Sequence, residues 1–450
     1  MRRLLLLSLA ALLLRAGVPS SAQNVQGHDA HPLAQSPPQV ATGARASAQE
    51  NVPLEQLAAD HNWPELESRL KDSVDSDTAL YRGLLMNRLG QYEQSHQLLE
   101  PLIRGLAAGA DRMQEKQARL ALASDDYRTF HYREAAVQYE ALEKCCAAML
   151  TETEKDEIEL PAKITPLLQN ADAQTLESTD SFTIPLARNA LGVRDAEVFV
   201  DGYPSRWIFD PASGFTLLSR SLAKRIGLKL AGADTVTVSN LNGKPVHAQV
   251  AIIPRLKVGA ASFRNVPAVV LADEDLYDNP HRYQIEGVLD QPLLAVMGVI
   301  TASDDDHLIV SQQPPITNGA PFFSDGNRLV AAVQSGGRQQ LYAIEPGTTE
   351  SILSSRFYEQ HPADFAGQTP QPMHLPDLSS EIPGYTEDTL TLGFGETLAT
   401  FHDIPVLVRA AGAERDRFYG TIGGNALDQL AAYTFDFRSM RFAVRVHSEQ

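Results

Sequence analysis

One phrase occurs twice in this chain, and it constrains the fold more than any other feature. The first copy runs from Phe209 to Ser219 as FDPASGFTLLS, and the second from Ile344 to Ser354 as IEPGTTESILS. In both copies an apolar run leads to an acid, a proline and small residues, and then to the start of a helix. The two acids, Asp210 and Glu345, are 135 residues apart. This spacing is the length of a lobe, so we expect the acids to face each other across a pseudo-twofold axis.

Two further anchors repeat in the same order. The segment from Leu256 to Pro267 matches Leu392 to Pro405, and the segment from Ile285 to Leu294 matches Gly420 to Leu427. Short apolar runs separated by Gly, Pro and Asn turns surround these anchors, which is the pattern of an all-β unit. The sequence therefore predicts a tandem duplication of a β lobe.

The expected lobes span residues 181–311 and 328–446, and a less regular stretch, 312–327, joins them. Because both lobes lie on one chain, the protein does not need to form a dimer to bring them together, so we expect a monomer.

This two-lobed unit resembles the retropepsin-like and pepsin-like aspartic peptidases, in particular exported bacterial ones with two fused lobes. The resemblance lies in Trp207 to Ser219, Leu341 to Ser354 and Ile422 to Phe442. It implies that an extended polypeptide binds between the lobes. It also implies that Asp210 and Glu345 activate water to hydrolyse a peptide bond, with no metal or cofactor.

The chain departs from that family's Asp-Thr/Ser-Gly turn in both lobes. Pro211 and Pro346 replace the Thr or Ser, which removes a hydroxyl and a backbone donor. Ala212 replaces the first Gly, whereas Gly347 keeps the second. Glu345 replaces the second Asp, and its extra methylene moves the carboxyl away from a close pair unless the loop retreats.

Two readings of the function follow from these departures. In the first, Asp210 and Glu345 are the catalytic residues of an aspartic-type endopeptidase, a hydrolase. Ser213, Gly347 and Thr348 then bind substrate, and the two hydroxyls replace the missing loop-to-loop contact. In the alternative, the protein is a pseudoprotease that captures peptide without cleaving it.

The first fifty residues predict export. Residues 1–22 read as a signal peptide, with Arg2 and Arg3 followed by the apolar run from Leu4 to Leu14. Residues 23–51 read as a flexible linker. The predicted location is the periplasm or the extracellular medium. The signal holds three of the 38 Lys and Arg residues and none of the 56 acids, so the formal charge of −18 becomes about −21. Such a charge argues against nucleic acid and anionic membranes as partners.

Residues 52–170 read as helices, and their turns loosely resemble the tetratricopeptide repeat. Three turns are each followed by an aromatic residue, namely Trp63, Tyr92 and Tyr132, at spacings of 29 and 40 residues. Such repeats often bind a protein partner, which is one expectation for this region. The other is that its tyrosines fill the space between stacked helices.

The only two cysteines are the neighbours Cys145 and Cys146. Adjacent residues on a helix do not offer the separation that a disulfide needs, so two half-buried thiols are expected. No His pair stands near them at zinc spacing, and no Gly-x-Ser-x-Gly phrase occurs. The sequence therefore gives no sign of a metal site or of a serine hydrolase.

Overall fold

The computed structural model describes residues 52–72, 78–106, 111–178, 180–231, 236–239, 244–326, 328–373, 381–412 and 416–447. The predicted signal peptide, 1–22, and the predicted linker, 23–51, lie outside the described residues. Among the helices that the structure describes, none combines the length and the apolar character needed to cross a membrane.

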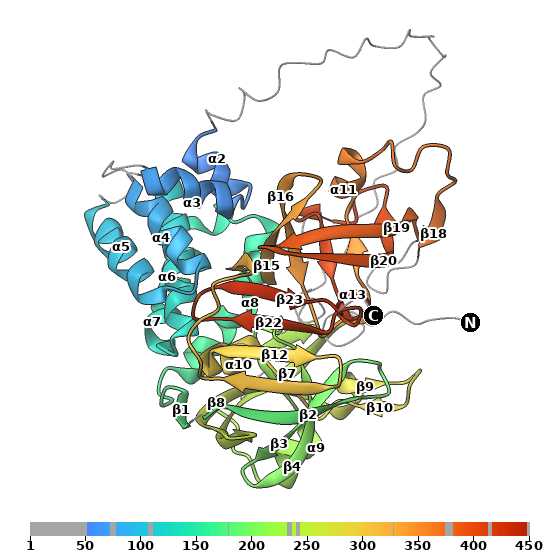
Figure 1. The fold of residues 1–450 in the computed structure, drawn as a ribbon. Helices are drawn as coiled ribbons and strands as arrows, with labels where there is room; N and C mark the ends of the chain where they lie inside the picture. Colours follow the sequence, from blue (N-terminus) through green and yellow to red (C-terminus); the bar gives the residue numbers. More distant parts are fainter. Residues whose placement is uncertain are drawn as a thin grey trace, which may run out of the picture.

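The first part of the chain is helical, as the sequence predicts. Its helices are α2 (Leu54–Ala59), α3 (Trp63–Asp72), α4 (Ala79–Arg88), α5 (Tyr92–Gly105), α6 (Arg112–Arg128), α7 (Tyr132–Cys146) and α8 (Glu152–Leu168). We call this part the helical domain. Figure 1 shows it in blue and teal along one side of the two β lobes.

The expected turns are where the helices reverse. His61, Gly90 and Phe130 have φ of 55°, 66° and 65°, and each lies one or two residues before a helix. The backbone can therefore leave one helix and enter the next within a few residues. Gly83 lets α4 and α5 approach, because a Cβ there would lie 2.4 Å from Cδ2 of Leu99.

The prediction for the cysteines is wrong. Cys145 and Cys146 form a disulfide, with an S–S distance of 2.04 Å. The prediction assumed that both residues are helical, but the backbone leaves α7 at Cys146, where φ is −140° and ψ is 7°. Two consecutive residues with different backbone conformations can direct their sulfur atoms toward each other.

Lobe 1 follows the helical domain and is built of short strands. Its elements are β1 (Thr175–Ser178), β2 (Phe182–Arg188), β3 (Arg194–Val200), β4 (Tyr203–Phe209), β5 (Thr216–Ser219), α9 (Arg220–Arg225), β6 (Val236–Ser239), β7 (Pro245–Val258), β8 (Ala261–Leu271), β9 (Tyr277–Asp278), β10 (Tyr283–Gln284), β11 (Gly287–Leu289), α10 (Gln291–Met297), β12 (Val299–Ser303) and β13 (His307–Ser311).

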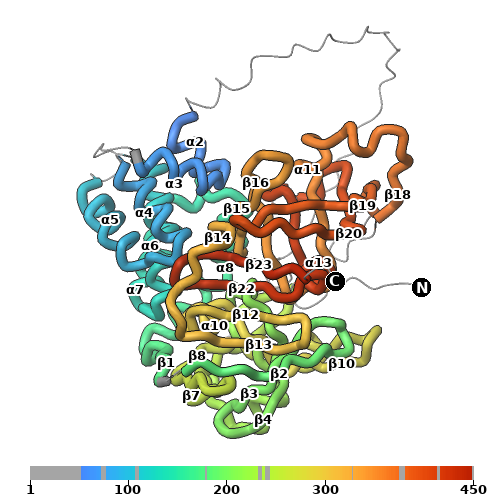
Figure 2. Tube along the Cα trace, viewed as in Figure 1, coloured from blue at the N-terminus to red at the C-terminus, as the bar shows by residue number. Residues whose placement is uncertain are grey.

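Lobe 2 begins within the stretch that the sequence suggested as a connection, since β14 (Ala320–Asp325) is a strand. The other elements are β15 (Arg328–Ser335), β16 (Arg338–Ile344), β17 (Ile352–Leu353), α11 (Ser355–Gln360), β18 (Gln371–Met373), β19 (Ile382–Phe394), β20 (Thr397–Leu407), β21 (Gly420–Ile422), α13 (Gly424–Leu427), β22 (Ala432–Asp436) and β23 (Arg441–Arg445). Figure 2 shows lobe 1 in green and yellow below lobe 2 in orange and red.

The duplication predicted from the sequence is visible in the hydrogen bonds. In each lobe the strand before the acid pairs in parallel with a later strand, β4 with β11 and β16 with β21. Equivalent backbone bonds then follow in pairs. In lobe 1 the bonds run from Asp210 N to Leu289 O, Ser213 N to Asp210 O, Gln291 N to Ser213 O and Ser219 N to Glu286 O. In lobe 2 the matching bonds, in the same order, run from Glu345 N to Ile422 O, Thr348 N to Glu345 O, Gly424 N to Thr348 O and Ser354 N to Tyr419 O.

The hairpin that precedes each acid also recurs. Asp201 and Gly202 turn between β3 and β4 with φ of 47° and 88°, and Gly336 and Gly337 turn between β15 and β16 with φ of 55° and 74°. Two consecutive residues with positive φ suit a tight hairpin whose twist matches the strands. The two turns are 135 residues apart, the same offset as the acids.

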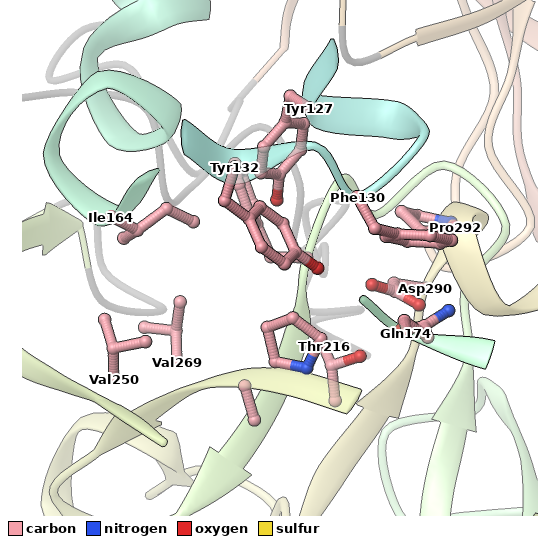
Figure 3. Close-up of a pocket in the computed structure, with 13 residues that line it drawn as sticks. Tyr127, Phe130, Tyr132, Ile164, Gln174, Thr216, Val250, Val269, Asp290 and Pro292 are labelled. Carbon is pink, nitrogen blue, oxygen red and sulfur yellow. The ribbon is translucent and has the colours of Figure 1, made fainter. Parts of the chain in front are cut away.

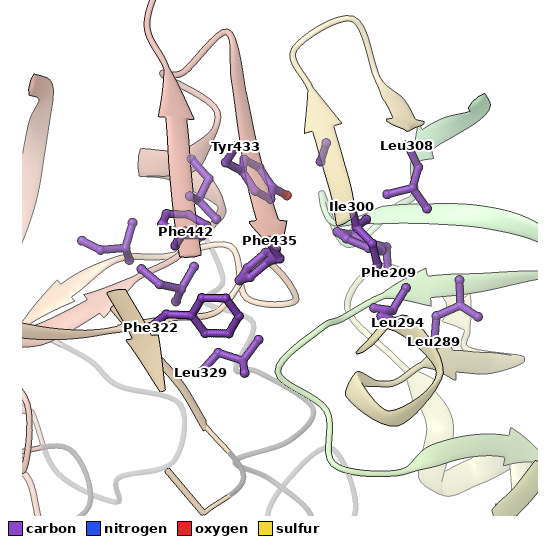
Figure 4. Close-up of a cluster of buried hydrophobic side chains, with 14 of the residues drawn as sticks. Phe209, Leu289, Leu294, Ile300, Leu308, Phe322, Leu329, Tyr433, Phe435 and Phe442 are labelled. Atoms are coloured by element: carbon purple, nitrogen blue, oxygen red, sulfur yellow. The ribbon is translucent and has the colours of Figure 1, made fainter. Parts of the chain in front are cut away.

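Strands of both lobes form one antiparallel sheet at their junction. β12 pairs with β13 and with β22, β13 pairs with β2, and β23 pairs with β22 and with β14. Its apolar side chains join one core that runs through both lobes. In Figure 4, Phe322, Phe435 and Phe442 lie on one side of this junction and Ile300 and Leu308 on the other. The lobes are therefore held together as one body.

Candidate functional site

Asp210 ends the apolar strand β4 and is completely buried. Its Oδ1 accepts a hydrogen bond from the backbone N–H of Ala212 at 3.0 Å. Its Oδ2 accepts none from the residues that the structure describes. A buried carboxyl oxygen without a partner is costly, so this atom is the part of the turn that most needs one.

The turn of lobe 2 lies directly on this carboxyl. A Cβ added to Gly347 would lie 2.2 Å from Cγ of Asp210, and 2.5 Å from its Oδ2. Any side chain at position 347 would therefore displace one of the two turns. The two predicted turns are brought together, and Gly347 is the residue that allows it.

Glu345 ends β16 at the place in lobe 2 that matches Asp210, and its exposed fraction is 6%. Its Oε1 accepts a hydrogen bond from Nη1 of Arg328 on β15, at 2.8 Å. The longer side chain of Glu thus reaches a cation on the neighbouring strand. The guanidinium of Arg328 balances a negative charge on Glu345 in a partly buried setting.

The pKa of Asp210 is raised to about 7. Burial is the main cause, and the charges of Glu345 and Asp290 add to it, whereas the backbone N–H groups of Ala212 and Ser213 oppose it. Asp210 therefore keeps its proton up to about neutral pH. Glu345 differs from Asp210 in having a cation, Arg328, as its partner.

The predicted hydroxyls occupy different places. Ser213 is fully buried and donates a hydrogen bond to the carbonyl of Phe215, at 2.9 Å, within its own turn. Thr348 lines a recess of about 140 Å³ next to Pro346 and Asn425. The hydroxyl of Ser213 therefore stabilises the turn of lobe 1, and Thr348 lies where a ligand could reach it.

Asp290 was not among the sequence candidates. It caps α10 by accepting a hydrogen bond from the N–H of Leu293, at 3.1 Å, and burial raises its pKa to about 7. Its equivalent in lobe 2 is Gly423, because Leu289 and Ile422 accept matching hydrogen bonds from the two acids. The replacement of a glycine by an acid in one copy was the signal that could have identified it.

The helical domain covers the face of lobe 1 that adjoins Asp210. Tyr132, Ile164 and other residues of α7 and α8 share one buried cluster with Ile208, Leu217 and Val288 of lobe 1. The ring centroids of Tyr127 and Phe215 are 5.9 Å apart. In Figure 3, Tyr127 and Tyr132 point from the helices toward Thr216 and Asp290. These two tyrosines thus pack against lobe 1, and not only between helices.

Polar contacts fix the helical domain to both lobes at once. Arg128 donates hydrogen bonds to Oε1 of Gln291 in lobe 1, at 3.0 Å, and to the carbonyl of Gly326 in lobe 2, at 2.7 Å. Asp325 beside Gly326 accepts from His61 Nδ1 at 2.7 Å and from Trp63 Nε1 at 3.2 Å. The turn between β14 and β15 is therefore held by the helices.

The arrangement of two β lobes, each with an acid at the same turn, is consistent with an aspartic-protease-like fold. The family model described as aspartyl protease matches residues 196–294, which include Asp210 and Asp290. No curated protein matches the chain.

Two solved structures illustrate the comparison. Basic 7S globulin from soybean has 11% identity and a TM-score of 0.38, covering 60% of this chain and 96% of that one. A retropepsin-like aspartic protease from Rickettsia conorii has 20% identity and a TM-score of 0.22, covering 30% of this chain and 93% of that one.

Proposed function

We propose that the β lobes bind an extended polypeptide and hydrolyse a peptide bond, with Asp210 as the general acid and Glu345 as the general base. The observation that carries this proposal is the meeting of the two acid turns, in which Gly347 lies on the carboxyl of Asp210 and Arg328 pairs with Glu345. Burial keeps a proton on Asp210 to about pH 7, while Arg328 pairs with Glu345 at 2.8 Å. Two carboxyls that hold one proton between them can supply both an acid and a base.

In this mechanism Glu345 removes a proton from a water molecule, and the oxygen of that water bonds to the carbonyl carbon of the substrate. Asp210 gives its proton to the carbonyl oxygen, so the tetrahedral intermediate carries no net charge. Glu345 then passes its proton to the nitrogen, the C–N bond breaks, and the hydroxyl proton returns to Asp210. We assign the contact with the substrate oxygen to Oδ2 of Asp210, which accepts no hydrogen bond from the described residues.

Binding without hydrolysis is the second candidate, and the enclosure of the acid favours it. The side chain of Asp210 has no exposed surface, and Pro211 and Pro346 supply neither a hydroxyl nor an N–H. A site of this kind captures peptide through strand-like hydrogen bonds. Export, a monomeric state and a protein partner for the helical domain stay predictions under both candidates.

The two candidates differ in the products of a digestion. An unfolded, carboxymethylated protein is incubated with the wild type, with Asp210→Asn and with Glu345→Gln from acidic to neutral pH, and new termini are counted by mass spectrometry. Loss of a general acid or base lowers the rate about 10²- to 10⁴-fold. The exposed Asp388, on β19, gives the control Asp388→Asn, which should cleave at the wild-type rate.

Equal cleavage by the wild type and by Asp210→Asn would contradict the acid role. If the wild type binds the unfolded protein but releases no new termini, the second candidate holds. If it neither binds nor cleaves, both are wrong.

A further inference from the structure

Two recesses are lined by residues of the paired turns or by residues close to them in sequence, one recess in each lobe. The first is lined by Phe215, Thr216, Asp290 and Pro292 of lobe 1. The second is lined by Pro346, Thr348, Gly424 and Asn425 of lobe 2, among others. Gly424 and Asn425 are the equivalents of Gln291 and Pro292, because Gln291 and Gly424 donate matching backbone bonds to Ser213 and Thr348. Of the residues that line the two recesses, Pro292 and Asn425 are therefore equivalent.

The first recess is nearly filled. Tyr127, Phe130, Tyr132 and Ile164 of the helical domain form its other wall and leave about 20 Å³, which is room for a single water molecule. Figure 3 shows these side chains above Thr216 and Asp290. The second recess holds about 140 Å³, and its far wall consists of Arg188, Arg194 and Asp428 of the lobes themselves.

The strand surfaces behind the two turns also differ in how far they are covered. Leu217 and Val288 of lobe 1 are completely buried beneath the helical domain. Their equivalents in lobe 2, at offsets of 135 and 133 residues, are Ile352 and Thr421, and both are partly exposed. Helices therefore cover this surface of lobe 1, whereas the matching surface of lobe 2 is partly open.

Buried apolar side chains and polar contacts both hold the helical domain against the lobes. Leu160 and Leu168 of α8 are buried to the same degree as the lobe residues that they join, with exposed fractions of 2% and 0%. Arg128 binds both lobes, and the buried Asp325 binds His61 and Trp63. Separating the helical domain from the lobes would expose the apolar cluster between them and leave the charge of Asp325 without its partners.

We propose that the helical domain is a fixed wall of the peptide site, which confines the site to the end of a polypeptide chain. The terminal residues stop at Tyr127, Phe130 and Tyr132, and the rest of the peptide runs along lobe 2 toward the recess at Thr348. This inference rests on the proposed function, since it specifies which part of a polypeptide the same site receives.

The test compares linear peptides with head-to-tail cyclised peptides of the same sequences. Pooled synthetic peptides carrying a fluorophore are titrated with the full chain, and anisotropy gives the dissociation constants. A ring has no end to place against the wall, so linear peptides should bind about tenfold tighter or more, equivalent to about 1.4 kcal/mol. Where cleavage occurs, the linear peptides should lose short pieces of one length from one terminus.

Two variants open the wall. Tyr132→Ala removes a ring from the first recess, and Phe130→Gly removes another at a position whose φ of 65° suits glycine, so its backbone is preserved. Both should bring the affinity for cyclic peptides close to that for linear ones. Leu142→Ala is the control, because Leu142 is also buried on α7 but lines neither recess.

Equal affinity of the wild type for linear and cyclic peptides would overturn the inference while leaving the proposed function intact. An unchanged ratio in folded Phe130→Gly would overturn it as well, since the wall would then not be the cause. If the wild type binds neither form of peptide, the proposed function fails, and the inference fails with it.

Discussion

Asp325 offers the sharpest test of how the helical domain is attached to lobe 2. Its side chain has no exposed surface. Beyond its hydrogen bonds to His61 and Trp63, its Oδ1 lies 3.7 Å from Nε of Arg88 and 3.9 Å from Nη1 of Arg417. Burial alone would raise the pKa of Asp325, but the nearby positive groups outweigh it and hold that pKa well below its ordinary value.

The change Asp325→Asn removes the negative charge and leaves the surrounding donors. Removing one partner of a fully buried pair costs about 3 to 5 kcal/mol. His61, Arg88 and Arg417 keep between 11% and 23% of their side-chain surface, so water can partly compensate them. We therefore expect a loss near the lower limit, about 3 kcal/mol in the free energy of unfolding.

Guanidinium unfolding followed by tryptophan fluorescence measures this loss, since Trp63 contacts Asp325 directly. Because the folded pKa of Asp325 is depressed, its stabilisation is complete above its ordinary pKa near 3.8 and is lost as the pH falls below that value. The difference between wild type and variant should thus be constant from neutral pH to about pH 5 and shrink below pH 4. The exposed Asp388 supplies the control variant Asp388→Asn. A loss below about 1 kcal/mol, typical of a surface pair, would refute the reasoning.

Three further predictions concern the turns and the disulfide. Gly347→Ala places a Cβ 2.2 Å from Cγ of Asp210 and should lower the free energy of unfolding by about 2 kcal/mol. The control is Gly105→Ala, whose Cβ would have nothing within 4 Å and should cost little. Equal thermal stability of the two variants would contradict the contact. Asp210→Asn should be more stable than the wild type above pH 7 by up to about 4 kcal/mol, because the raised pKa of Asp210 makes its charged form costly. This gain should disappear below the ordinary pKa of Asp near 3.8. Chemical unfolding measures it, and a gain that does not change with pH would contradict the raised pKa. Alkylation of the denatured protein should label Cys145 and Cys146 only after reduction, so label incorporated without a reductant would exclude the disulfide.

The two-lobed architecture was predictable because local sequence determines it. A turn that ends a buried strand requires an acid, small residues and a helix start in a fixed order, and these patterns survive in both copies. The equivalent hydrogen bonds of Asp210 and Glu345 confirm that the copies fold alike. The helical turns at Gly90 and Phe130 were found in the same way.

The contacts that decide the chemistry were not predictable, since they join residues that no pattern connects. Arg328 could be assigned to Glu345 only once β15 and β16 were paired in register. Tyr127 and Tyr132 gave a helical signal but no sign that they face lobe 1. The disulfide was missed because the prediction extended α7 as a regular helix through Cys146.

The differences between the two turns are consistent with one another when equivalent residues are compared across the pseudo-twofold axis. In lobe 1 Asp195 pairs with Ile208, and in lobe 2 Val330 pairs with Ala343, so Asp195 and Val330 occupy equivalent positions. Counting two residues back from each, the lobe 1 equivalent of Arg328 is Val193. Lobe 1 thus has a short acid and an apolar neighbour, and lobe 2 a longer acid that reaches a cation. Burial raises the pKa of Asp210 in lobe 1, whereas Arg328 pairs with Glu345 in lobe 2, and this difference between the two acids is what the proposed hydrolysis uses.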